Sequence, residues 1–137
     1  MELIYFTGKK TSAKDPLLLA IKLLAPARGL TEFCLIEEFT RKVAEDSDHP
    51  MFVVMRPHDE EALIDIYFTR HLLSRIPGIL ILPNRERHTA ALAFRIGPTR
   101  IFPCDANHSE VVAAVSAFLN KWPENTIPGS DKYSAAA

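Results

Sequence analysis

Two short runs of the chain are apolar at every position, MFVVM at residues 51–55 and GILILP at residues 78–83. Successive side chains of a strand point to opposite faces, so a strand of this composition is covered by other residues on both sides. Such strands are typical of the centre of a parallel sheet that has helices on both faces. The chain is therefore expected to be an α/β protein.

The rest of the sequence alternates between strand-like and helix-like segments. Strands are predicted at residues 2–6, 30–36, 51–55, 78–83 and 99–104. Helices are predicted at residues 16–25, 37–46, 56–76, 84–97 and 107–122. This alternation predicts right-handed βαβ units, and hence one three-layer (βα)5 domain with a doubly wound parallel sheet over residues 1–122. Residues 123–137 are rich in Pro, Gly and Ser, and we expect a flexible C-terminal tail there.

Charge and composition exclude several classes of protein. The formal net charge is −1, so we expect no direct nucleic-acid partner and no membrane partner. No apolar run is long enough to cross a bilayer, and the start of the chain, MELIYFTGKK, lacks the pattern of a signal peptide. Cys34 and Cys104 form no disulfide framework, and we expect two small buried thiols in a reducing compartment. The prediction is a soluble cytoplasmic protein.

The order and spacing of these segments resemble the receiver domain of bacterial response regulators. The similarity covers residues 2–122 and is clearest over residues 78–122, where an apolar strand, an alanine-rich helix, a glycine turn at Gly97, a short strand and a final helix follow one another. The resemblance implies a CheY-like, flavodoxin-like sheet with strand order 2-1-3-4-5. It also implies a role in two-component signalling.

The residues that make a receiver work are not matched. A receiver holds Mg²⁺ with an acidic pair after its first strand, where this chain has Thr7, Gly8, Lys9 and Lys10. The phosphoacceptor aspartate closes the third strand, where Met55 or Arg56 stands here. The fourth strand ends in Pro83 and Asn84 instead of Ser or Thr, and Cys104 or Phe102 takes the place of the lysine after the fifth. Phosphoryl transfer to a carboxylate needs a cation and oxygen ligands to hold it. The resemblance therefore implies a degenerate pseudo-receiver.

A domain of this kind is expected to be no enzyme, to carry no cofactor, and to act through contacts with a protein partner or as a homodimer. The face that receivers use is formed by the fourth helix, the fifth strand and the fifth helix. The candidate interface residues on it are Arg87, Ala91, Arg95 and Phe102. Small residues such as the alanines of this helix allow close approach of a partner, although an ordinary packed helix carries them too.

A second hypothesis places a small-anion or nucleotide site at the carboxyl ends of the strands. Lys9, Lys10, Arg56 and Arg85 are the candidate anion-binding residues, and helix N-termini should lie near them. The alternative is a solvated loop edge where basic residues are simply common, because no Walker loop or GxGxxG motif is present.

Two further groups of residues have both a chemical and a structural interpretation. Cys104 with Asp105 and His108 could form a thiolate and its base, but a cysteine that ends a buried strand is more often a small hydrophobe. The segment HDEE at residues 58–61 could suggest a metal site, but an acidic helix start with Asp59 as its cap explains it better. No catalytic residue and no metal site are therefore predicted.

Overall fold

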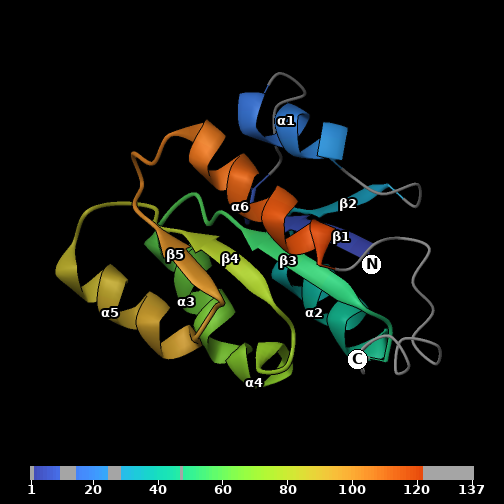
Figure 1. Cartoon of the computed structure of the whole chain (residues 1–137). Coiled ribbons are helices and arrows are strands. Elements are labelled where there is room, and N and C mark those ends of the chain that lie inside the picture. The colour runs from blue at the N-terminus through green and yellow to red at the C-terminus, as the bar shows by residue number, and fades with distance from the viewer. Residues whose placement is uncertain (1, 10–14, 25–28, 47, 122–137) are drawn as a thin grey trace.

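The computed structural model describes residues 2–9, 15–24, 29–46 and 48–121. Its strands are β1 (Glu2–Phe6), β2 (Leu30–Phe33), β3 (Met51–Met55), β4 (Gly78–Ile81) and β5 (Arg100–Phe102). They form one parallel sheet in the order β2-β1-β3-β4-β5 (Figure 1). This is the predicted α/β class and strand order, and the fold is flavodoxin-like. The tail at 123–137 and the predicted site residue Lys10 lie outside the described residues.

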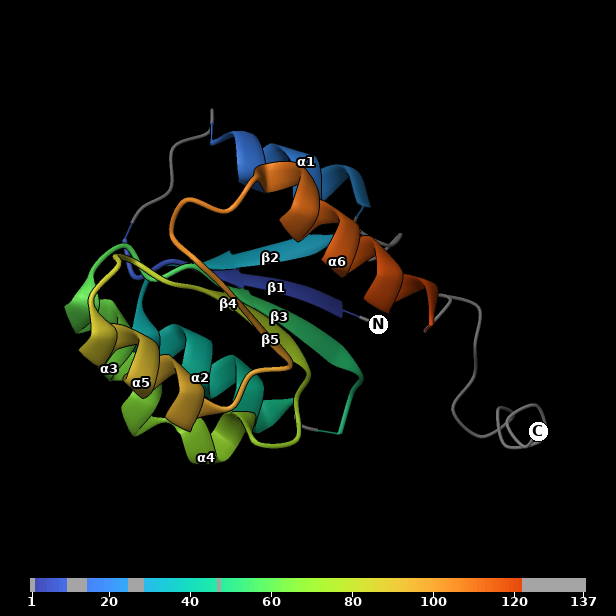
Figure 2. The ribbon, with the colours of Figure 1, turned by 60° about the vertical axis from the view of Figure 1, so that its left-hand side comes forward.

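The helices cover both faces of this sheet. They are α1 (Pro16–Leu24), α2 (Ile36–Glu45), α3 (Glu60–Phe68), α4 (Arg70–Leu73), α5 (Arg87–Ile96) and α6 (His108–Asn120). Figure 2 shows α1 and α6 above the sheet and the other helices below it. None of the helices within the described part of the chain is long and apolar enough to cross a membrane.

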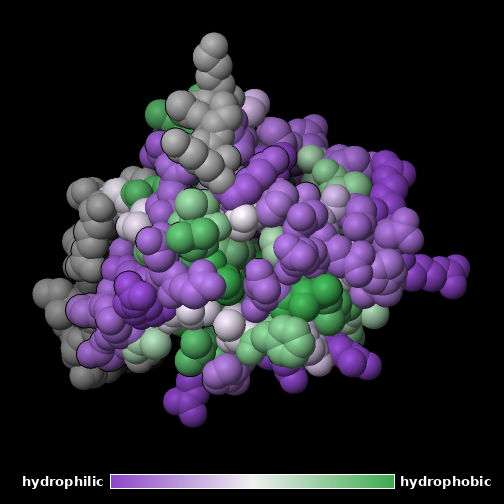
Figure 3. Space-filling model, turned by 180° about the vertical axis from the view of Figure 1, so that it is seen from behind, coloured by the Kyte–Doolittle hydropathy of each residue, from purple (hydrophilic) through white to green (hydrophobic). Residues whose placement is uncertain are grey.

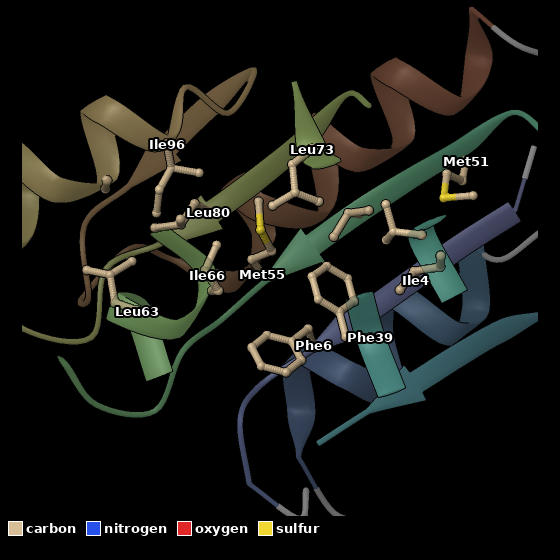
Figure 4. Close-up of a cluster of buried hydrophobic side chains, with 13 residues drawn as sticks. Ile4, Phe6, Phe39, Met51, Met55, Leu63, Ile66, Leu73, Leu80 and Ile96 are labelled. Carbon is tan, nitrogen blue, oxygen red and sulfur yellow. The ribbon is translucent and has the colours of Figure 1, made fainter. Parts of the chain in front are cut away.

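Each face of the sheet has its own core, and the central strands supply side chains to both. Ile4 and Phe6 of β1 point into the core under α2, α3 and α5, where the rings of Phe6 and Phe39 stack with centroids 4.8 Å apart (Figure 4). Their neighbours Leu3 and Tyr5 point to the core under α1 and α6. All five residues of β3 are buried, which confirms that its unbroken apolar run marks a central strand.

The helix predicted over residues 56–76 is interrupted. The chain makes α3, turns at Thr69 and continues as the short α4. The Thr69 hydroxyl donates a hydrogen bond to the Ile66 carbonyl at 3.0 Å, and its backbone N–H donates to the same oxygen. A threonine that bonds back to the preceding turn offers the backbone an alternative to continuing the helix. The apolar pattern runs through this break, so periodicity alone predicts a single helix.

Candidate functional site

The carboxyl ends of β1 and β3 lie side by side at the centre of the sheet. The chain leaves β1 toward α1 on one face and leaves β3 toward α3 on the other, so this is the switch point where ligands bind in open α/β sheets. The backbone N–H of Arg56 donates to the Phe6 carbonyl at 2.8 Å and holds the two ends together. This is the edge at which the sequence predicts either receiver chemistry or an anion site.

Arg56, the residue after β3, forms an ion pair with Asp15. Its Nη1 lies 3.2 Å from each carboxylate oxygen of Asp15. The same carboxylate caps α1 by accepting the backbone N–H of Leu17 at 3.0 Å, as the Asp15–Pro16 pair in the sequence indicates. A cation that is already paired with a carboxylate attracts a free anion less strongly, so Arg56 is a weaker anion-binding residue than its position suggests.

Tyr5 lies beneath this ion pair. Its side chain is fully buried, and its hydroxyl lies beside the Arg56 guanidinium without a hydrogen bond of good geometry to any residue that the structure describes. Burial raises the pKa of the Tyr5 hydroxyl above its usual 10.0, and the nearby Arg56 guanidinium only partly offsets this rise. A buried, unpaired hydroxyl costs stability, which makes this position unusual for an internal strand residue.

The segment after β1 packs against the start of α3. Gly8 has φ +85°, and a Cβ added there would lie 2.7 Å from the Cβ of Ala62. His58 Nδ1 lies 3.2 Å from the Thr7 carbonyl oxygen, while its Nε2 lies 3.1 Å from an Asp59 carboxylate oxygen. The positions where a receiver carries its acidic pair are therefore occupied by a close backbone packing contact.

The acidic residues at the start of α3 have structural partners. Asp59 accepts the backbone N–H of Ala62 at 2.9 Å and is the N-cap of α3. Glu60 lies 2.7 Å from Nε2 of His88 on α5, and this contact raises the pKa of His88 above its usual 6.5. No group of three or more His, Cys, Asp or Glu residues that could hold a metal ion occurs in the described ranges.

The predicted basic edge is divided between separate ion pairs. Arg85 pairs with Asp105, the residue after Cys104, while Arg56 pairs with Asp15. Lys9 is exposed. Asn84 accepts hydrogen bonds from the Thr89 hydroxyl at 2.6 Å and from the Glu86 backbone N–H at 3.0 Å, so it organises the turn into α5. Two of the four predicted cations, Arg56 and Arg85, thus have carboxylate partners that the sequence does not indicate.

The expectation of two buried thiols is wrong. Cys104 is exposed and Cys34 is only partly buried. The reason for Cys104 is that β5 ends at Phe102, so the cysteine lies in the following turn and not in the sheet. Within the part of the chain that the structure describes, no hydrogen bond joins Cys104 to His108, and Asp105 pairs with Arg85. The arrangement gives the thiol no positioned base.

The candidate interface residues are only partly on the surface. Arg87, Ala91 and Arg95 are exposed along one side of α5, as expected. Phe102 does not fit the prediction of an interface residue, because its side chain is only 4% exposed. Its ring packs in the core under α1 and α6, and the Arg100 guanidinium lies 4.5 Å from the ring centroid.

Two exposed aromatic residues lie outside the sites that the sequence predicts. Phe94 on α5 is 79% exposed and Phe68 on α3 is 69% exposed. Helical spacing could have found both, since the buried residues of α5 are Thr89, Ala93 and Ile96, and Phe94 lies outside that stripe. The surface of these helices is therefore less polar than the sequence indicates.

No protein-family model, curated protein or solved structure matches the chain. The resemblance to receiver domains stays a prediction that rests on pattern and on strand order.

Proposed function

We propose that the chain is a pseudo-receiver, a non-enzymatic domain that acts in signal transduction through protein–protein contacts and accepts no phosphoryl group. The observation that carries the proposal is the Arg56–Asp15 ion pair at the carboxyl end of β3. In a receiver the end of this strand holds the carboxylate that attacks the phosphoryl donor, and here Met55 closes the strand and Arg56 follows it. The positive charge of Arg56 is directed at the carboxylate of Asp15.

The chemistry of aspartyl phosphorylation supports this interpretation. A divalent cation must offset the charge on the transferred phosphoryl oxygens, and it needs a cluster of carboxylate and carbonyl ligands. Asp15 accepts hydrogen bonds from the α1 backbone and from Arg56, so it is not free to bind a metal. Lys9, in the segment where a receiver holds its acidic pair, repels one.

The exposed aromatic residues support a role in contacts. Phe94 is an exposed residue of α5, one of the three elements (α5, β5 and α6) that form the face receivers use for dimers and effectors. Exposed aromatic side chains flanked by arginine are enriched at protein interfaces. Arg87 and Arg95 flank Phe94 on the same helix.

The proposal is tested by thermal denaturation with Mg²⁺ and beryllofluoride, together with a mass measurement after incubation with acetyl phosphate. We expect no shift of the melting temperature and no added phosphoryl group, while an active receiver under the same conditions shows both. A ligand at a hundred times its Kd adds about 2.7 kcal/mol of stability, so binding would be visible as a shift of several degrees. Such a shift with beryllofluoride overturns the proposal.

The same experiment addresses the alternative function. A shift with phosphate, sulfate or a nucleotide would favour a small-anion or nucleotide-binding domain that uses the strand-end edge. Replacing Lys9 and Arg85 with neutral residues should then abolish the shift.

A further inference from the structure

Two neighbouring helices expose apolar side chains next to charges of opposite sign. On α3 the buried residues are Ala62, Leu63 and Ile66, so Glu61, Ile64 and Phe68 lie on the opposite, exposed side. On α5 the residues opposite its buried stripe are Arg87, Ala91 and Phe94. We call these six residues the α3–α5 surface. In the view from behind, hydrophobic side chains interrupt a largely hydrophilic surface (Figure 3).

The two helices are parallel and aligned. They pack side by side on the same face of the sheet, and both follow strands of one direction (Figure 2). The contact between Glu60 and His88 fixes their relative height: residues at the same level are 28 positions apart (88 minus 60). Ile64 is therefore level with residue 92, next to Ala91, and Phe68 is level with residue 96, two residues after Phe94. Glu61 is level with residue 89, two residues after Arg87.

We propose that the α3–α5 surface binds a second copy of this chain in a two-fold dimer, with α3 of each copy packed on α5 of the other. The proposal deepens the contact function proposed above and rests on it. A two-fold axis that runs between the helices and along them exchanges their places and keeps their direction. It brings Glu61 to Arg87 of the partner subunit, Ile64 to the partner's Ala91, and Phe68 to the partner's Phe94.

Charge complementarity favours a second copy of this chain in this arrangement. The exposed side of α3 carries Glu61, whereas the exposed side of α5 carries Arg87 and Arg95. Pairing α5 with its own copy would bring arginines of both chains together, and such like-charge contacts are destabilising. Pairing α3 with α5 places each carboxylate opposite a guanidinium, and small Ala91 leaves room for the bulkier Ile64. The dimer also removes Phe68 and Phe94 from water, which is favourable.

The oligomeric state of the full chain, measured by sedimentation over a wide range of concentration, tests the proposal. We expect a concentration-dependent dimer. Phe68→Glu should raise its dissociation constant by about 100-fold or more, because it puts a charge into the apolar contact between Phe68 and the partner's Phe94. The matched control is Leu23→Glu on α1: Leu23 is 88% exposed and lies on the other face of the sheet, so the dimer should persist. Far-UV circular dichroism verifies that both variants are folded.

A charge exchange tests the pairing itself. Glu61→Arg and Arg87→Glu should each weaken the dimer by about tenfold, since the symmetry creates two copies of the contact. The double variant E61R/R87E should restore it, because the two opposite charges meet again across the interface. If the double variant E61R/R87E does not dimerise again, the proposed pairing is wrong.

Other outcomes also overturn the inference. They are a chain that stays monomeric at every concentration, a dimer that Phe68→Glu leaves intact, and a dimer that Leu23→Glu disrupts. A monomer that also gives no response to beryllofluoride overturns the dimer alone and leaves the pseudo-receiver proposal standing, so the two failures are distinguishable.

Discussion

Arg56 and Asp15 are 41 residues apart in the chain, and Nη1 of Arg56 lies 3.2 Å from each carboxylate oxygen of Asp15. This ion pair joins the end of β3 to the start of α1, across the switch point of the sheet. It fixes the position of α1 as well as the charge of the strand-end edge.

Replacing Arg56 with leucine should lower the free energy of unfolding by about 1 kcal/mol. The variant leaves the carboxylate of Asp15 without its cation, but the Arg56 side chain is 35% exposed, and water screens the loss. Urea denaturation measures the effect. The control is Arg95→Leu, which removes an exposed arginine of α5 and should change stability little. An unchanged midpoint of urea denaturation for Arg56→Leu would show that the ion pair contributes nothing to the free energy of unfolding.

Tyr5→Phe should leave stability unchanged or raise it by up to about 1 kcal/mol. The hydroxyl is buried, and its contact with the Arg56 guanidinium lacks good hydrogen-bond geometry, so removing it also removes a desolvation cost. The aromatic ring and its packing in the core under α1 and α6 are kept. Thermal denaturation of the two proteins side by side gives the result. A clear loss of stability would mean that the hydroxyl makes a hydrogen bond after all.

The contact between His88 and Glu60 should appear as a pH dependence. Glu60 raises the pKa of His88 above 6.5, so the attraction is fully present below that pH and is lost as the pH rises through the higher value in the folded protein. In Glu60→Gln, an NMR titration of the His88 ring should give a lower pKa. Glu61→Gln on the same turn is the control and should leave the pKa where it is. An equal pKa in Glu60→Gln and in the unmodified chain would contradict the assignment.

Gly8→Ala should destabilise the protein by about 1–3 kcal/mol. The cost has two parts, a positive φ of +85° and a methyl group that meets Ala62 at 2.7 Å. Gly29→Ala separates them, because Gly29 has φ +86° but no atom within 4 Å of an added Cβ. Gly29→Ala should therefore cost only the backbone strain, about 1 kcal/mol. Equal losses for the two variants in urea denaturation would rule out the close contact with Ala62.

The sequence predicts the sheet well because its signal is local. The central strands β3 and β4 are short apolar runs, and the alternation of Leu3 and Tyr5 with Ile4 and Phe6 follows from the strand period of two. The caps at Asp15 and Asp59 are also local signals, and both predictions are confirmed.

The candidate site is predicted less well because its contacts join distant segments. Nothing near Arg56 or Arg85 in the sequence indicates that Asp15 and Asp105 pair with them. The exposure of Cys104 follows from where β5 ends, and a strand boundary is set by pairing with β4 more than by composition. To predict that Phe94 is exposed, one must know which side of α5 faces the sheet. The buried residues of that helix define this side.

β1 and β3 contribute alternate side chains to the cores on both faces of the sheet. If either layer of helices detached, the apolar side chains that β1 and β3 direct to that face would be exposed to water. The same two strands also form part of the core on the other face. The two layers should therefore unfold in one cooperative transition, and the amide protons of β1 and β3 should exchange with solvent only through global unfolding. In a domain built this way, a protein that binds one layer of helices stabilises the whole chain.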